Sequence, residues 1–197
     1  YRDFLSLKPF KIVNRKTAHI MAEQSLGKLG VNPRDYMTYT QYGGDSTDLA
    51  ATYVVRHLGQ EAGTELLEKE LDDAGWYATW FKPLKKESYD IWLDPAGKFT
   101  SWNHTVEEDA SGPNLSQTKA RQLAESWLKA HGTDLSQYKP VDSSSDTLKH
   151  RTDHWFTQEK KKLHVAQAKF RLSVEVQGNE VMAFSRFVKI PDEYERN

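Results

Sequence analysis

The stretch NRKTAHIMAEQSLGKLGVNPRDY (14–36) recurs without a gap as SQTKARQLAESWLKAHGTDLSQY (116–138). The two segments lie 102 residues apart and agree at six of 23 positions. The identical pairs are Ala18/Ala120, Ala22/Ala124, Glu23/Glu125, Leu26/Leu128, Gly30/Gly132 and Tyr36/Tyr138. Because a repeat of this length corresponds to one supersecondary unit, the sequence predicts two similar units in tandem.

Each segment has the pattern of one amphipathic helix. Asn14 and Ser116 are good N-caps, because a short side-chain oxygen can accept from the free N–H groups of the first turn. Gly30 and Gly132 stand where a left-handed C-terminal residue is needed, a conformation that glycine adopts at little cost. The predicted inward positions are 18, 21, 22, 25, 26 and 29 in the first copy and 120, 123, 124, 127, 128 and 131 in the second.

After each helix, apolar and polar residues alternate as they do along a strand that is buried on one face. In the first copy this pattern ends at the turn DPAG (94–97), and in the second at QGN (177–179), which is a good hairpin turn. We therefore expect each unit to be a helix packed on an antiparallel meander of three to four strands. The alternating residues are Tyr89, Ile91 and Leu93 in the first copy and Phe170, Leu172, Val174 and Val176 in the second.

The two copies differ in length between the helix and the first aromatic strand. In the first copy, about 23 extra residues within the range 46–74 predict two short helices that break near Gly59. A linker rich in Gly, Pro and Ser (107–116) separates the copies. The expected fold class is α+β, with a first repeat over 1–112 that carries the helical insertion and a second repeat over 113–197.

Composition limits the classes of function. With 38% hydrophobic and 12% aromatic residues the chain is expected to fold, and its net charge of −1 gives no general attraction for nucleic acid. The absence of cysteine excludes disulfides, thiolate catalysis and Cys-ligated zinc. No run of about 18 apolar residues is present to span a membrane. Since the chain starts at Tyr1, we expect it to be part of a longer polypeptide.

The stretch LKHRTDHWF (148–156) is the best candidate for a catalytic or metal site, because it places His150, Arg151, Asp153 and His154 within five positions. The repeat places these residues at or near a strand, where residues four apart are separated by roughly 13 Å. Zinc needs its nitrogen ligands at about 2 Å, so His150 and His154 cannot share one metal on a regular strand. A polar strand edge is therefore favoured, with His150 and His154 as the remaining metal candidates.

Other polar clusters favour ordinary structural roles. The adjacent carboxylates Glu107 and Glu108 belong to the polar linker, Ser143–Asp146 has the composition of a turn, and Lys160–Lys162 is expected in a solvated hairpin turn. Neither a G-x-S-x-G elbow nor a phosphate-binding glycine loop is present. The Trp and Tyr residues are expected mainly in the core. The sequence therefore predicts no catalytic or cofactor-binding residues and no cofactor.

Two resemblances follow from particular segments. TKARQLAESWLKAHG (118–132) resembles the helix of a PepSY-type module. The segments FLSLKPFKI (4–12), WFKPLKKESYDIWLDPAGK (80–98), HRTDHWF (150–156) and RFVKIPDEYER (186–196) are similar to the N-terminal extracytoplasmic region of bacterial CAAX-type (CPBP family) intramembrane proteases. That resemblance implies that residues 1–10 follow a membrane anchor and that the C-terminus leads toward a membrane domain. The catalytic E-E-x-x-x-R signature of that family is missing, because Gly112 stands where its arginine would be.

Three hypotheses of function follow. The first is a non-catalytic extracytoplasmic module of a CAAX-type endopeptidase, which binds a peptide or protein, possibly its own protease domain, or regulates access to the protease. In this hypothesis a peptide could add a strand to an exposed sheet edge, and other segments of the polypeptide would hold the module at a bacterial membrane. The second is a stand-alone envelope protein whose ligand lies on one sheet or between the units. The third is a hydrolase or metal enzyme built on His150, Asp153 and His154.

Overall fold

The computed structural model describes residues 12–44, 49–71 and 74–195. The helices are α1 (Arg15–Lys28), α2 (Leu49–Leu58), α3 (Gln60–Glu70), α4 (Gln117–Ala130) and α5 (Asp192–Glu195), with a 3-10 turn η1 (Leu135–Gln137). The strands are β1 (Met37–Gly44), β2 (Ala74–Phe81), β3 (Ser88–Leu93), β4 (Phe99–Thr105), β5 (Tyr138–Thr147), β6 (Thr152–Val165), β7 (Ala168–Gln177) and β8 (Glu180–Lys189). Residues 1–10, predicted to follow a membrane anchor, lie outside the described ranges. Within those ranges, no helix combines the length and the apolar character that crossing a bilayer requires.

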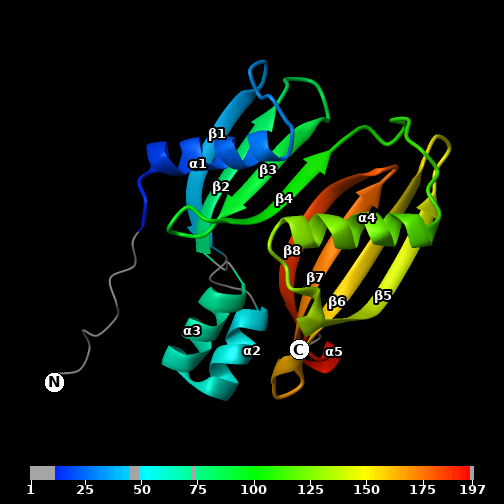
Figure 1. Cartoon of the computed structure of the whole chain (residues 1–197). Helices are drawn as coiled ribbons and strands as arrows, with labels where there is room; N and C mark the ends of the chain where they lie inside the picture. The colour runs from blue at the N-terminus through cyan, green and yellow to red at the C-terminus, as the bar shows by residue number, and fades with distance from the viewer. Residues whose placement is uncertain (1–11, 45–48, 72–73, 196–197) are drawn as a thin grey trace.

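The described strands form one antiparallel sheet of eight strands in the order β1-β2-β3-β4-β8-β7-β6-β5 (Figure 1). Each unit contributes a meander of four strands and one covering helix, which confirms the predicted tandem α+β fold. The units join through β4 and β8, the last strand of each, with Trp102 opposite Phe184 and Asn103 opposite Ala183. Because these last strands pair antiparallel, the two meanders are related by an approximate two-fold axis, as in a symmetric dimer interface, although they belong to one chain.

The predicted helix caps are confirmed in both units, whereas His131, predicted to point inward, is exposed at the end of α4. The side chains of Asn14 and Ser116 accept hydrogen bonds from backbone N–H groups three residues later. Gly30 and Gly132 have φ of +87° and +83°, in the left-handed region that favours glycine. The buried helix residues are Ala18, Ala22 and Leu26 in α1 and Ala120, Ala124 and Leu128 in α4, with Met21, Leu29, Leu123 and Trp127 packed beside them. Both helices cover the same face of the sheet (Figure 1).

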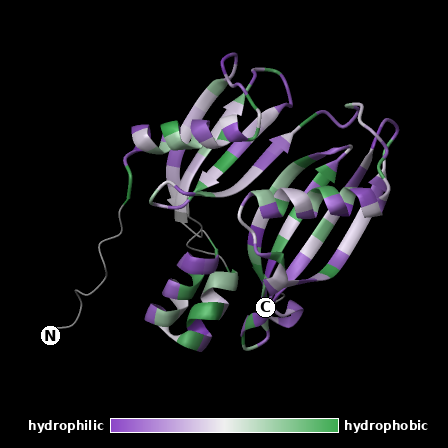
Figure 2. Ribbon diagram, viewed as in Figure 1, coloured by the Kyte–Doolittle hydropathy of each residue, from purple (hydrophilic) through white to green (hydrophobic). Residues whose placement is uncertain are grey.

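The helical insertion of the first unit is also confirmed, and its contacts lie mainly with the second unit. α2 and α3 flank Gly59, whose φ is +85°. Their apolar side chains pack with the far ends of β6, β7 and β8, which form a second core cluster. Figure 2 shows both hydrophobic and hydrophilic residues on these two helices. The buried members of this cluster are Ala50, Tyr53, Val54, Leu67, Leu71, Val165, Ala168, Phe170, Val188 and Ile190.

Two predicted turns are wrong. Ser143–Asp146 lies within β5, and Lys160–Lys162 lies within β6, because the β6–β7 hairpin extends to Val165 and turns at Ala166, whose φ is +49°. The lysines have specific contacts there: Lys160 pairs with Glu70 of the insertion, and Lys161 donates to the backbone oxygen of Ser136. Local polarity suggested turns, whereas pairing with neighbouring strands determines the observed conformation.

Candidate functional site

The stretch 150–154 is not a polar strand edge. Its strand, β6, lies between β5 and β7, and Arg151 through His154 are all buried, while His150 is exposed in the preceding bend. The burial is explained by the linker between the units, which crosses this end of the sheet and hydrogen-bonds to it. The edge prediction failed because nothing in the local sequence shows that the linker folds back over these residues.

His154 has a structural role in this arrangement. Its Nδ1 lies 2.7 Å from the Ser145 hydroxyl, and its Nε2 lies 2.9 Å from the backbone oxygen of Leu115. A carbonyl oxygen can only accept, so Nε2 carries the proton and Nδ1 accepts from the serine. Neither nitrogen is left to ligate a metal. Across the described part of the chain, no three His, Cys, Asp or Glu residues are grouped to hold a metal ion.

Arg151 and Asp153 hold the linker in place. The guanidinium Nε donates to both carboxylate oxygens of Asp153, at 2.9 and 3.1 Å, and Nη1 donates to the backbone oxygens of Glu107 and Ala110, at 3.2 and 2.8 Å. The side chains of Arg151 and Asp153 are 7% and 5% exposed. The cluster therefore forms the joint between the repeats, and its charged groups are already paired. The adjacent carboxylates of the linker, Glu107 and Glu108, are exposed, and both contact Lys86.

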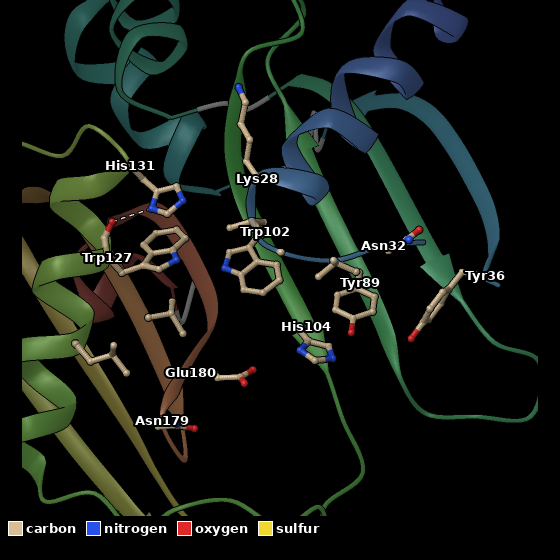
Figure 3. Close-up of a pocket in the computed structure, with 15 residues that line it drawn as sticks. Lys28, Asn32, Tyr36, Tyr89, Trp102, His104, Trp127, His131, Asn179 and Glu180 are labelled. Atoms are coloured by element: carbon tan, nitrogen blue, oxygen red, sulfur yellow. Dashed lines mark hydrogen bonds between the residues drawn. The ribbon is translucent and has the colours of Figure 1, made fainter. Parts of the chain in front are cut away.

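A groove of about 630 Å³ lies between the two units, on the face of the sheet that carries the helices (Figure 3). We call it the inter-repeat groove. Its walls are the C-terminal ends of α1 and α4, its floor is formed by β3 and β4, and the β7–β8 turn closes one side. The lining residues are Lys28, Leu29, Gly30, Val31, Asn32, Tyr36, Tyr89, Trp102, His104, Leu123, Trp127, His131, Asn179, Glu180 and Val181.

The floor of the inter-repeat groove is aromatic. The ring of His104 stacks on Tyr89 with centroids 4.1 Å apart and lies 6.2 Å from the ring of Trp102. Trp102 is 6% exposed, and its indole Nε1 is buried with no hydrogen-bond partner among the residues that the structure describes. Figure 3 shows this nitrogen on the side of the ring that is turned toward Trp127. A buried N–H without an acceptor is costly, so this donor is suited to an oxygen that arrives with a ligand.

A carboxylate stands behind this floor. Glu87 Oε1 accepts from the Tyr89 hydroxyl at 3.2 Å and lies 3.6 Å from His104 Nε2, which is too far for a hydrogen bond. Burial alone would raise the pKa of Glu87. The net effect is a lowered pKa, because hydrogen bonds from the Tyr36 and Tyr89 hydroxyls and the nearby His104 outweigh the burial. Burial also lowers the pKa of His104, although the carboxylates of Glu87 and Glu180 oppose this effect. At neutral pH, Glu87 is therefore anionic and His104 neutral.

The two edges of the sheet are β1 and β5. Pro140 removes one backbone donor from β5, and a bulge follows it between Pro140 and Asp142. Proline and bulges of this kind commonly prevent strand addition at a sheet edge, so β5 is poorly suited to bind a peptide in this way.

The sequence allowed a ligand site between the units but did not indicate the residues of the inter-repeat groove. Its floor residues were assigned to core packing, because Tyr89 and Trp102 follow the same alternation as buried strand residues. Trp127 occupies a predicted inward position but is only half-buried, since it forms the groove wall beside His131. One signal was available in the stretch TSWNH (100–104). Trp102 and His104 are two residues apart, so they share a strand face, and a histidine thus takes an inward strand position.

Comparison with known proteins agrees with the repeated architecture. Residues 63–187 match DUF4901, described as the YcdB, YcdC repeated domain. The chain belongs to this family. The DUF4901 match runs from α3 to β8, so it includes strands of both units and the groove floor. Among curated proteins, none matches this chain.

A solved structure shares the fold of this DUF4901 protein. The Bacillus megaterium YpeB C-terminal domain superposes with a TM-score of 0.52 and 13% sequence identity, over 92% of this chain and 70% of that one. At this identity the similarity concerns the fold alone, and it supports the assignment of tandem PepSY-like units.

Proposed function

We propose that the chain is a non-catalytic binding module outside the cytoplasm, which holds a peptide or an extended segment of a protein partner in the inter-repeat groove. Its membership of a repeated-domain family and its PepSY-like fold support the proposal. The charged cluster that most resembled a catalytic site is engaged in joining the repeats, which leaves the groove as the strongest candidate site.

One observation carries this proposal: the groove combines an aromatic floor with a buried donor that no described residue of the chain accepts from. Ligand sites are typically concave and mostly apolar, with a few polar groups that orient the ligand. Trp102 provides such a polar group, and the half-buried Trp127 provides apolar surface. A peptide has a backbone oxygen at every residue, so peptides of many different sequences can accept a hydrogen bond from the indole N–H of Trp102.

We also propose that the module belongs to a larger membrane protein of the CAAX-type protease family. This part of the proposal is supported only by the resemblance of the four segments described above. It is tested by the sequence of the native polypeptide beyond Asn197, where we expect several hydrophobic spans that include E-E-x-x-x-R. A downstream sequence without these features would contradict the link to a protease.

Peptide binding is tested by selecting ligands from a displayed random peptide library and measuring their affinity by calorimetry. Trp127→Leu removes an aromatic wall of the groove, and Tyr39→Leu on β1 is the control, because Tyr39 is an exposed aromatic residue outside the groove. We expect Trp127→Leu to weaken binding at least about tenfold, which corresponds to about 1.4 kcal/mol, and Tyr39→Leu to leave it unchanged. Failure to select any peptide, or equal binding by both variants, would contradict the proposed role.

A further inference from the structure

α1 and α4 both end at the inter-repeat groove. Lys28 and Leu29 at the end of α1 line one wall, and Trp127 and His131 at the end of α4 line the other. Figure 1 shows the two helices running toward each other, so that their C-terminal ends meet at the boundary between the units. Each helix C-terminus carries roughly half a negative charge, so both favour a cation in the space between them.

Two carboxylates add to this potential. Glu180 extends across the groove toward His104 (Figure 3), and Glu87 lies behind His104. The histidine does not neutralise them, because burial keeps it uncharged at neutral pH. Lys28 is the basic residue of the lining, and Figure 3 shows its side chain extending away from the aromatic rings. The part of the groove beside Trp102 and Trp127 is therefore negative, whereas Lys82 places a positive charge over Tyr36 at the opposite end.

The aromatic rings of the groove suit the same type of ligand. The face of an aromatic ring attracts a cation within about 6 Å of its centroid, and among Trp102, Tyr89 and Trp127 the half-buried Trp127 is the most accessible, because Trp102 and Tyr89 are 6% and 8% exposed. One lining ring already makes such a contact within the chain, because Lys82 Nζ lies 4.4 Å from the ring centroid of Tyr36, at the end of the groove opposite Trp127. An anionic ligand would meet the same rings, both carboxylates and two helix C-termini unfavourably.

We propose that the inter-repeat groove recognises an arginine side chain of the bound peptide. The planar guanidinium stacks against Trp127 and donates to the carboxylate of Glu180, a combination that the compact ammonium of lysine makes less well. The indole N–H of Trp102 donates to a backbone oxygen of the same peptide. This inference rests on the proposed peptide-binding function and specifies the residue that the groove selects.

The test compares two synthetic pentapeptides, acetyl-Gly-Ala-Arg-Ala-Gly-amide and the same peptide with citrulline in place of arginine, by calorimetry at low salt. Citrulline keeps the shape and most donors of arginine but has no charge. The protein variants are Glu180→Gln, which keeps the shape of the side chain, and the control Glu65→Gln, at an exposed position of α3 outside the groove. We expect the wild type to bind the arginine peptide at least about tenfold more tightly than the citrulline peptide.

Glu180→Gln should weaken binding of the arginine peptide about threefold or more and leave the citrulline peptide unaffected, whereas Glu65→Gln should change neither. This difference between two ligands separates loss of a charge contact from a general structural effect. Equal affinity for both peptides would overturn the preference for arginine but not the proposed peptide binding. If neither these peptides nor those selected from the library bind, both the preference and the proposed function are wrong.

Discussion

Arg151→Met provides the most direct test of how the repeats are joined. In the wild type, Arg151 neutralises the buried carboxylate of Asp153 and donates to the backbone oxygens of Glu107 and Ala110. Methionine keeps most of the volume but leaves that carboxylate unpaired, with a side chain that is only 5% exposed. Breaking a buried ion pair by removing one partner costs about 3–5 kcal/mol. Domains of this size have a free energy of unfolding of only about 5–15 kcal/mol, so the effect should be large.

The assay is urea unfolding at neutral pH, followed by tryptophan fluorescence. The double variant Arg151→Met/Asp153→Leu removes both charges, so we expect it to be more stable than Arg151→Met alone. His150→Ala is the matched control from the same stretch. His150 is exposed and contacts the linker through its backbone oxygen, which accepts from Gly112 N–H at 3.0 Å, so its replacement should change stability by less than about 0.5 kcal/mol. A loss below about 1 kcal/mol for Arg151→Met, or a larger loss for His150→Ala, would refute this account of the joint.

Three further predictions concern the core and two titrating groups. Leu26→Ala and Leu128→Ala, at helix residues that are 0% and 1% exposed, should each lower the free energy of unfolding in urea by about 2–5 kcal/mol, and a loss below about 1 kcal/mol in either would contradict the repeat. Burial and the hydrogen bond to Asp90 raise the pKa of Tyr77 to about 12. Because this tyrosine ionises at a lower pH in the unfolded chain, the free energy of unfolding should fall as pH rises from about 10 to 12. A tyrosinate absorbance titration that gives an ordinary pKa would contradict this. In an NMR titration, His104 should show a pKa below its ordinary value of 6.5, because burial favours its neutral form. Its contribution to stability should therefore decline as pH falls below 6.5. A pKa above 6.5 would show that the carboxylates of Glu87 and Glu180 outweigh burial.

The local signals predicted the fold well. The N-cap side chains of Asn14 and Ser116 and the left-handed Gly30 and Gly132 act within one or two turns of helix, so their effects can be inferred from neighbouring residues. Strand alternation likewise depends only on which face is buried. The helical insertion was predicted because one copy is longer than the other at a single place. These features need no knowledge of the tertiary arrangement.

The candidate site could not be predicted in this way. The units meet through two residue pairs of β4 and β8, about 80 positions apart in sequence, and no local pattern marks Trp102 or Phe184 as partners. The role of His154 also depends on a distant acceptor, the backbone oxygen of Leu115. In a single sequence, a histidine that joins two repeats cannot be distinguished from one that ligates a metal. Contacts between segments far apart in the sequence determined both the pairing of β4 with β8 and the role of His154.

The inter-repeat groove is a consequence of the duplication itself. In each unit the helix packs on the sheet, α1 over β1, β2 and β3 and α4 over β6, β7 and β8, and its C-terminal end lies toward the other unit. When the last strands β4 and β8 pair, the ends of α1 and α4 face each other and form opposite walls. Divergence between the copies then makes the groove asymmetric: β4 contributes Trp102 and His104 to the floor, whereas β8 contributes Phe184 to the core opposite Trp102. The duplication thus accounts for the position of the groove, and the differences between the copies account for its chemistry.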